Sequence, residues 1–237
     1  MVNKLDYNHI HDFIDLDYKK CINIQKSLIN QISLIPLSKE VNVVAGVDLS
    51  FYKEFGLAII VIIDKNFNEL EVKYHYQEIE FPYIPGLLAF RELPVFLNAW
   101  KKVTIRPDIV FFDGHGIAHP RKMGIATHAS FFIEIPTIGI AKSKLYGNFD
   151  EPGNNKGDYS YIYDKKDKKI GCVIRTREKT KPVFVSPGNF ITIDEARYFA
   201  LKFSTRYKLP EPTRLAHYYS QKIKNEIFPR RNANGKI

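Results

Sequence analysis

The feature that most constrains this fold is a series of three neighbouring stretches rich in apolar and β-branched residues, at 41–51, 56–63 and 70–81. Such stretches are typical of strands, and the third alternates apolar and polar residues as a half-buried strand does. Strands joined by short connections pair antiparallel, because a parallel crossover needs about a dozen residues or more. The sequence therefore predicts three antiparallel strands at the start of the core.

The sequence beyond Gly86 alternates helical and extended patterns instead. A helical pattern follows Gly86, with Pro94 acceptable only in its first turn, and precedes a buried strand at 107–113. A helix at 126–133 then leads to a strand at 136–141, which indicates parallel strands joined by crossover helices. The other expected elements are an amphipathic helix at 12–35, a polar loop at 146–158, strands at 159–164 and 169–174, a helix at 194–207 capped by Thr192, and a last helix from about Thr213.

The predicted order of elements is three strands, a helix, a strand, a helix and a strand. The same order is found in ribonuclease H-like sheets. The predicted fold class is therefore α/β: a ribonuclease H-like mixed sheet, with three antiparallel strands followed by parallel strands, flanked by helices. At 237 residues the chain suits a single domain, 1–237. No apolar run is long enough to span a bilayer, and Cys21 and Cys172 form no disulfide framework. A cytoplasmic monomer with two buried thiols is expected.

The charge balance is compatible with a polyanionic partner. Lys and Arg number 35 against 26 Asp and Glu, which gives a net charge of +9. A basic protein neutralises phosphates and releases their counterions when it binds nucleic acid. The same surplus can serve solubility alone, so charge by itself leaves both interpretations open.

Two aspartates occupy positions where a buried sheet should be apolar. Asp48 interrupts the first strand between Val47 and Leu49, and Asp113 ends the strand at 107–113. A buried, unpaired carboxylate is costly, so each needs a cation, a cage of hydrogen bonds or a metal. If the two strands lie side by side and parallel, both carboxylates reach the same sheet edge, where ligands of open α/β sheets collect.

The chemistry of this pair suits a hard divalent cation. Mg²⁺ prefers oxygen ligands, retains waters and completes its shell with substrate phosphate, so a phosphodiester-cleaving site is the simplest use. Glu92 heads a helix between the two aspartates and adds a third acidic group. Each aspartate alone can equally cap a strand end or pair with a basic side chain, whereas the occurrence of all three favours the metal site.

Histidines form the other group of candidate residues. His115, His119 and His128 bracket the Gly-rich turn after Asp113, whereas His75 lies in an alternating polar face and is expected to be solvated. Their spacing matches no common zinc pattern and no Cys joins them, so zinc is disfavoured. A histidine here can move a proton near a reacting oxygen, or it can be a hydrogen-bonded structural residue.

A long, ordered set of motifs resembles the endonuclease V family. The most extensive is DGHGIAHPR at 113–121, which is followed by GIATH at 124–128 and IGIAKS at 138–143. The set also includes VAGVD at 44–48, PYIPGLLAFRE at 82–92, SPG at 186–188 and YKLPEPTRLAH at 207–217. The resemblance spans roughly residues 20–225.

This resemblance implies a ribonuclease H-like nuclease that uses Mg²⁺, with Mn²⁺ as a substitute. Its implied activity is DNA repair: hydrolysis of the second phosphodiester 3′ to deoxyinosine, which leaves 3′-hydroxyl and 5′-phosphate ends. By the same resemblance Asp48 and Asp113 bind the metal, and Glu92 is the acidic catalytic residue. Lys142 stabilises charge at the scissile phosphate, and His217 is the C-terminal catalytic histidine near the metal. One or two ions are compatible with this set.

The segment of Pro82, Tyr83, Ile84 and Pro85 resembles the wedge of that family, in which an aromatic side chain fills the gap left by an extruded base. Two prolines stiffen the segment, so Tyr83 can be presented without a large ordering cost. Without the family resemblance, Tyr83 would be interpreted as a half-buried tyrosine in a turn.

Two glycines and three polar residues complete the expected substrate site. Gly86 and Gly114 can let backbone groups approach an extruded hypoxanthine, which a tight pocket can distinguish from guanine and adenine. His119, Arg121 and His128 are expected to contact the strand or support the turn, and Arg121 can equally pair with a carboxylate. His115 and the loop at 148–157 have no role assigned by sequence.

Two other functions stay open at this point. An inosine-specific endoribonuclease on the same scaffold differs only in contacts to the 2′-hydroxyl. A non-catalytic nucleic-acid-binding protein is also compatible with the fold, although the joint presence of the five candidate catalytic residues disfavours it.

Overall fold

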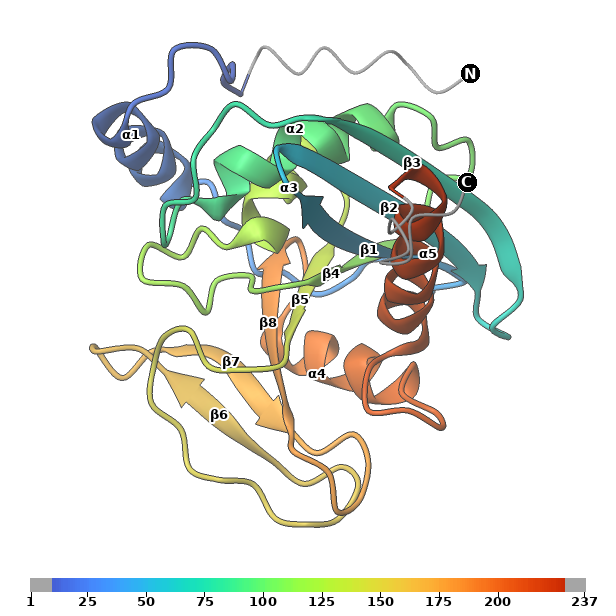
Figure 1. Ribbon diagram of the computed structural model, residues 1–237. Coiled ribbons are helices and arrows are strands. Elements are labelled where there is room, and N and C mark those ends of the chain that lie inside the picture. Colours follow the sequence, from blue (N-terminus) through green and yellow to red (C-terminus); the bar gives the residue numbers. More distant parts are fainter. Residues whose placement is uncertain (1–9, 229–237) are drawn as a thin grey trace, which may run out of the picture.

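The structure, a computed structural model, describes residues 10–228 and is built around one mixed sheet with helices on both faces (Figure 1). The strands are β1 (Val43–Tyr52), β2 (Phe55–Asp64), β3 (Glu69–Glu78), β4 (Ile109–Asp113), β5 (Thr137–Ala141), β6 (Tyr159–Tyr163), β7 (Lys169–Ile174) and β8 (Val183–Asn189). The helices are α1 (Tyr18–Ile29), α2 (Leu88–Trp100), α3 (Ile125–Ile133), α4 (Ile193–Lys202) and α5 (Glu211–Ile227).

The eight strands form one sheet in the order β3-β2-β1-β4-β5-β8-β7-β6. The first three strands pair antiparallel, and β4 and β5 then continue from β1 in parallel. Both pairings agree with the prediction from connection lengths. Beyond β5 the sheet returns to antiparallel pairing through β8, β7 and β6.

Strand β8 was not among the elements predicted from sequence. Its second half contains Pro187 and Gly188, which are rare in strand interiors because one lacks an N–H and the other lacks a side chain to pack. Here β8 is nevertheless buried along its whole length and pairs with β5 and β7. Tertiary pairing therefore overrides the local preference of this segment.

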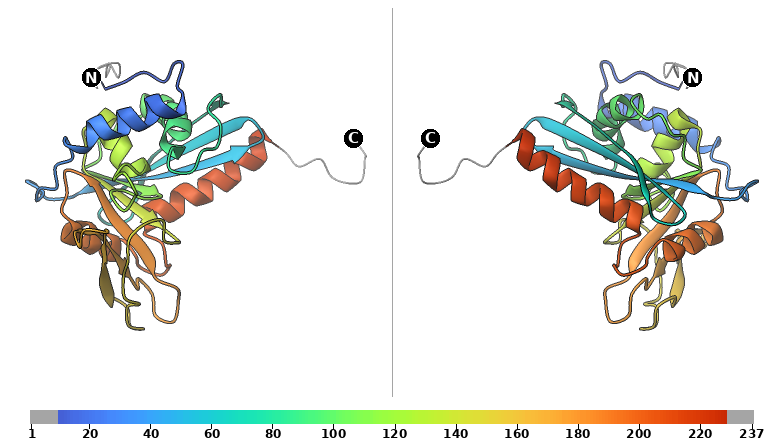
Figure 2. Two further views of the ribbon diagram at one scale, coloured as in Figure 1. Left: turned by 90° about the vertical axis from the view of Figure 1, so that its left-hand side faces the viewer. Right: turned by 90° about the vertical axis from the view of Figure 1, so that its right-hand side faces the viewer.

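The sheet separates two apolar cores, because alternate residues of a strand point to opposite faces. Ala45 and Val47 of β1 face a core shared with α2 and α3, whereas Val44 faces a core shared with α4 and α5. Figure 2 shows α5 on one side of the sheet and α1 and α2 on the other. Gly46 lies on the α5 side, and a Cβ there would overlap the carbonyl group of Pro212. The start of α5 thus touches the backbone of β1 directly.

Helix α1 is shorter than the amphipathic pattern at 12–35 predicted. It begins after Asp17, whose side chain accepts a hydrogen bond from the Lys20 N–H at 2.7 Å, and it ends at Ile29. Phe13 and Ile32 lie outside the helix but still pack against the core. The regular spacing of apolar residues therefore extends beyond both ends of α1, because the flanking segments are also partly buried.

Proline 94 contradicts the expectation that it would lie in a first turn. Helix α2 begins at Leu88, so Pro94 lies in its second turn and leaves the Phe90 carbonyl without the usual helical donor. The apolar side chains of this turn, among them Leu93 and Phe96, are fully buried against the sheet. Burial of that face compensates for the lost hydrogen bond.

Three smaller expectations can be compared with the structure. Cys21 and Cys172 are both buried free thiols, as predicted. Thr192 caps α4 through a reciprocal capping box with Glu195, although that helix ends at Lys202 and not near 207. Among residues 10–228, the structure contains no helix with the length and apolarity needed to cross a membrane.

Candidate metal centre and nucleic-acid interface

The two predicted aspartates lie next to each other at one edge of the parallel part of the sheet. Val47 of β1 pairs with Phe112 of β4, so the residues that follow, Asp48 and Asp113, are neighbours in the parallel register. Their side chains point to the face covered by α5, since Val47 and Phe112 point to the other face. Asp48 is only 4% exposed, so its carboxylate is buried.

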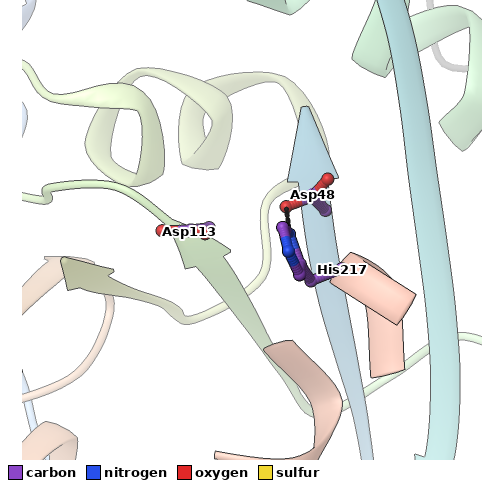
Figure 3. A group of neighbouring side chains, drawn as sticks. All are labelled: Asp48, Asp113 and His217. Atoms are coloured by element: carbon purple, nitrogen blue, oxygen red, sulfur yellow. Dashed lines mark hydrogen bonds and ion pairs between the residues drawn. The ribbon is translucent and has the colours of Figure 1, made fainter. Parts of the chain in front are cut away.

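A third candidate ligand comes from α5. His217 lies about one and a half turns beyond Pro212, the residue that touches the backbone of β1. Its Nδ1 is 3.2 Å from Oδ1 of Asp48, and its side chain is 45% exposed. One donor atom each from Asp48, Asp113 and His217 lies within 4.8 Å of the others (Figure 3).

This donor set fits a divalent cation. Two carboxylate oxygens and one imidazole nitrogen converge from three elements, and the partial exposure of His217 leaves a side open for water or phosphate. Within residues 10–228 this is the one group of three such donors close enough to share an ion. The histidines at 115, 119 and 128 form no such group in that range.

Glu92 lies beside this group on α2. Its pKa is raised from 4.5 to about 8, first by burial and then by the negative charges of Asp113 and Asp48, while Arg91 opposes them. A carboxyl group with this pKa is protonated near neutral pH in the absence of a cation. A bound divalent ion would favour the charged form, because a positive charge nearby reverses the effect of the two aspartates.

Lys142 connects the end of β5 to the same edge of the sheet. It follows Ala141 directly, and its Nζ donates to Oδ2 of Asp113 at 2.8 Å. Its side chain is about half exposed, so the ammonium group can also reach a solvent-side phosphate. The structure therefore brings Asp48, Asp113, Lys142 and His217 together, with Glu92 close to both aspartates.

The predicted wedge segment, Pro82 to Pro85, lies in the connection between β3 and α2. Tyr83 is 69% exposed, so its ring projects from the surface and is not the half-buried turn residue of the alternative interpretation. Gly86 follows with φ of +80°, a conformation that disfavours other residues. Its carbonyl oxygen accepts hydrogen bonds from Nη2 of Arg121 at 2.8 Å and from Nε2 of Gln25 at 3.1 Å.

The polar residues of the DGHGIAHPR motif have internal partners. Arg121 contacts Gln25 and Gly86, so in this structure it binds an amide and a carbonyl and not a carboxylate. Nδ1 of His119 accepts from the backbone N–H of Arg121 at 3.2 Å. Burial lowers the pKa of His119 to about 4, so its ring is neutral at physiological pH. These contacts support the turn beside Gly86.

Two other histidines of this region are neutral as well. His128 is fully buried in α3, where its Nε2 lies 2.7 Å from Nε2 of His11, and burial lowers its pKa strongly. That position suits support of the fold and not contact with a nucleic-acid strand. Burial also lowers the pKa of His115, to about 4.

The turn after Asp113, at 114–117, is held by β8. The backbone N–H of Gly116 donates to Oγ of Ser186 at 2.8 Å, and that of Ile117 donates to the carbonyl of Pro187 at 2.8 Å. The SPG motif at 186–188 thus places the turn that follows the metal-site aspartate. Sequence reasoning quoted this motif but gave it no role.

Comparison with known sequences agrees with this geometry. Residues 26–218 match the sequence family described as endonuclease V, a range that contains all five candidate catalytic residues. The chain belongs to the endonuclease V family. Its relatives indicate that the protein is a nuclease. The family is metal-dependent, which agrees with the donor group of Asp48, Asp113 and His217.

Individual endonuclease V proteins match nearly the whole chain. The endonuclease V of Thermosipho melanesiensis is 57% identical over 223 residues, which cover 94% of this chain and 98% of that protein. The crystal structure of endonuclease V from Bacillus subtilis superposes with a TM-score of 0.88 at 34% identity and covers 92% of this chain and 96% of that one. Endonuclease V structures have the ribonuclease H-like fold, which confirms the predicted fold class.

A third endonuclease V has been solved with nucleic acid. The protein from Ciona intestinalis superposes with a TM-score of 0.78 at 25% identity, and the match covers 88% of this chain and 98% of that one. It was crystallised with a 24mer DNA that contains an inosine followed by a ribo-adenosine.

Sequence reasoning missed two residues that hold the backbone beside the candidate site. Gln25 and Ser186 contact neither the aspartates nor the wedge tyrosine, but each fixes the backbone beside one of them. A glutamine in an amphipathic helix and a serine before a proline have no chemistry that singles them out. Only the occurrence of SPG within the family motifs could have marked Ser186.

Proposed function

We propose that this chain is a metal-dependent endonuclease that recognises deoxyinosine in DNA and hydrolyses the second phosphodiester bond 3′ to it. The products are 3′-hydroxyl and 5′-phosphate ends, and the role is repair of deaminated adenine. The observation that carries this proposal is the convergence of Asp48, Asp113 and His217 beside Lys142, in a chain of the endonuclease V family.

The proposed cofactor is Mg²⁺, with Mn²⁺ as a substitute, which Asp48 and Asp113 would hold with His217 beside them. When bound, such an ion polarises the scissile phosphate and lowers the pKa of an attacking water. Carboxylate oxygens favour these two cations, since both take hard oxygen ligands.

The protein residues around the ion would orient and neutralise the substrate. Lys142 offsets the charge that builds up on the phosphate, because its ammonium group already lies at the Asp113 carboxylate. His217, half exposed beside Asp48, can hold or transfer a proton at the reacting oxygen. Glu92, which keeps a proton until a cation arrives, completes the acidic group.

Lesion recognition would take place at the wedge segment and the turn beside it. Exposed Tyr83 fills the gap in the base stack, and extrusion of a mispaired base costs only a few kcal/mol. Backbone groups near Gly86 and Gly114 read the hypoxanthine, while His119 and Arg121 hold the surrounding backbone and His128 contacts the side chain of His11. The net charge of +9 supports contacts to the flanking phosphates.

The decisive experiment is mapping of the cut on a labelled duplex with a single deoxyinosine, incubated with the protein and Mg²⁺. Cleavage at the second phosphodiester 3′ to inosine is expected, and both chelation and added salt should reduce it, the latter through lost phosphate contacts. An abasic product, or cuts without regard to inosine, would contradict the proposal.

Inosine in RNA is a second candidate substrate. The ligand of the Ciona protein has a ribonucleotide directly after the inosine, so that relative accommodates a 2′-hydroxyl there. Parallel cleavage assays on DNA and RNA strands of the same sequence separate the two. Faster cleavage of the RNA strand would make the protein an endoribonuclease with the same catalytic residues.

A further inference from the structure

The side chain of Gln25 is the one polar group of α1 that is fully buried in the described residues, with 0% exposure. A buried amide is costly unless its donor and acceptor are both satisfied. Here its Nε2 donates to the Gly86 carbonyl at 3.1 Å, and its Oε1 accepts from Nε of Arg121 at 2.5 Å. The orientation of the amide is therefore set by two partners.

Those two partners also contact each other. Nη2 of Arg121 donates to the same Gly86 carbonyl at 2.8 Å, so Gln25, Arg121 and Gly86 form a closed ring of hydrogen bonds. A carbonyl that accepts from both an amide and a guanidinium group has little freedom to rotate. Gly86 adopts a φ of +80° where the chain turns from the wedge segment into α2. The ring of hydrogen bonds therefore holds this turn in place.

The other end of the wedge segment is fixed as well. Nη1 of Arg91 donates to the carbonyl of Phe81 at 2.7 Å, and the Arg91 guanidinium lies 4.9 Å from the ring centre of Phe51. Tyr83 thus projects from a short piece of chain whose two ends are both held by side chains of other elements. Of these holding groups, Gln25 alone comes from α1.

We propose that Gln25 is a positioning residue for lesion selection, which acts on Tyr83 through the Gly86 carbonyl. This inference rests on the proposed function of Tyr83 as a wedge. Gln25 touches neither the substrate nor the reacting atoms. It keeps the wedge segment in the orientation that lets the tyrosine ring enter the base stack, so ordering of this segment costs less when DNA binds.

Glutamine suits this task because it combines a donor for Gly86 with an acceptor for Arg121. Glutamate of the same size keeps the acceptor but presents an oxygen to the Gly86 carbonyl. Methionine, of similar volume, removes both hydrogen bonds. Gln31 offers a matched control, since it follows the same helix, is exposed and makes only a long hydrogen bond to the Ser27 carbonyl at 3.5 Å.

The test measures kcat and KM on a duplex with one deoxyinosine and on the matched undamaged duplex, for wild type and for the variants Q25E, Q25M and Q31M. For both Gln25 variants the preference for inosine should fall about tenfold, or ~1.4 kcal/mol, mainly through a higher KM for the inosine duplex. Cleavage of the undamaged duplex and the Mg²⁺ dependence should stay as in wild type, and Q31M should match wild type throughout.

A double-mutant cycle separates positioning from a general structural role. In a Tyr83→Ala background the Gln25 substitutions should no longer change the preference, because the side chain they position is absent. An equal loss with and without Tyr83 would overturn the inference. If Q25M does not fold, Q25E, which keeps both the size and the contact to Arg121, carries the same test.

The outcomes distinguish this inference from the function on which it rests. A wild-type protein that shows no preference for inosine would remove the proposed function and this inference with it. A wild-type protein with a strong preference, combined with Gln25 variants that retain it, would overturn the positioning role alone.

Discussion

The metal centre and the wedge segment are held in place by different means. Asp48 and Asp113 lie on adjacent paired strands, and α5, which carries His217, contacts the backbone of β1 at Gly46. Tyr83 lies outside any helix or strand, between ends that are held by a few side-chain hydrogen bonds to carbonyl groups. The candidate metal ligands are therefore fixed by the main-chain framework, whereas the residue proposed to select the lesion depends on side chains.

This difference separates rigidity from adaptability. Strand pairing in the centre of a sheet opens only with much of the fold, while a segment held by a few hydrogen bonds, each worth about 1 kcal/mol, can shift when a base is extruded. Substitutions near the aspartates should consequently affect the rate on every substrate. Substitutions near Gly86 should instead affect the choice between substrates.

The largest effect is expected for Asp48→Asn, which keeps the size of the side chain but weakens the metal site. Single-turnover cleavage of inosine duplex should fall by about a thousandfold or more, since a catalytic ion contributes several kcal/mol. Binding of the duplex in a gel-shift assay should persist. Asp64→Asn, at the last residue of β2, is the acidic control and should keep full activity. Wild-type turnover by the Asp48 variant would contradict the expectation that the residues held by the sheet determine the cleavage rate.

Tyr83→Ala should act on selectivity instead. Stacking of one aromatic side chain on a base is worth about 1–3 kcal/mol, so the ratio of inosine to undamaged cleavage should drop about tenfold to a hundredfold. The rate on undamaged strand should change little, because the metal centre is intact. Tyr198→Ala, an exposed tyrosine on α4, serves as the control. An unchanged ratio for Tyr83→Ala would reject the wedge.

The stability of the metal-free protein, measured as a function of pH, tests how strongly the fold disfavours the charged form of Glu92. The pKa of Glu92 is about 8 in the folded protein against 4.5 for the free group, so between these values the folded chain holds a proton that the unfolded chain has lost. Stability should therefore decrease as pH rises from about 4.5 to 8, by up to ~1 kcal/mol per pH unit. Urea unfolding of wild type and Glu92→Gln measures this slope, which should flatten in the variant.

The affinity for the metal ion should depend on pH in the opposite direction to the stability of the metal-free protein. Because the ion displaces the proton of Glu92, its apparent affinity should increase with pH over the same range, by at most about tenfold per unit for one proton. A wild-type affinity independent of pH would mean that Glu92 plays no part in holding the ion.

The smallest effect concerns the turn that follows Asp113. Ser186→Ala removes the acceptor of the Gly116 N–H and should cost about 1–2 kcal/mol of stability together with a severalfold loss of rate. Thr192→Ala, which removes the cap of α4, should cost a similar ~1 kcal/mol without loss of rate. Thermal unfolding and cleavage assays on both variants show whether stability and activity separate as expected.

The sequence made the metal centre easier to predict than the wedge support. A charged residue inside an apolar strand is visible without any structure, and the short connections of the first strands implied which neighbours pair. Asp48 and Asp113 were expected at one sheet edge on the condition that the strands at 41–51 and 107–113 lie side by side and parallel, a condition that the structure meets. His217 and Lys142 required the family resemblance, because nothing in local periodicity tells where a distant helix or loop returns to the sheet.

The remaining features depend on tertiary contacts that no local pattern contains. Strand β8 carries Pro187 and Gly188 yet pairs on both sides, and Pro94 lies within α2 because the buried face of that helix outweighs one missing hydrogen bond. Gln25 looks like an ordinary helix residue, and its importance follows only from the approach of Gly86 and Arg121. Such contacts join segments far apart in sequence.

The backbone contact between Gly46 and Pro212 has a consequence for the order in which the protein becomes active. A growing chain emerges with both aspartates and Tyr83 long before α5 is made, yet the imidazole of His217 reaches the two aspartates only when α5 docks. A polypeptide that ended before residue 211 would carry Asp48, Asp113 and Tyr83 but would lack the imidazole donor of the candidate metal centre.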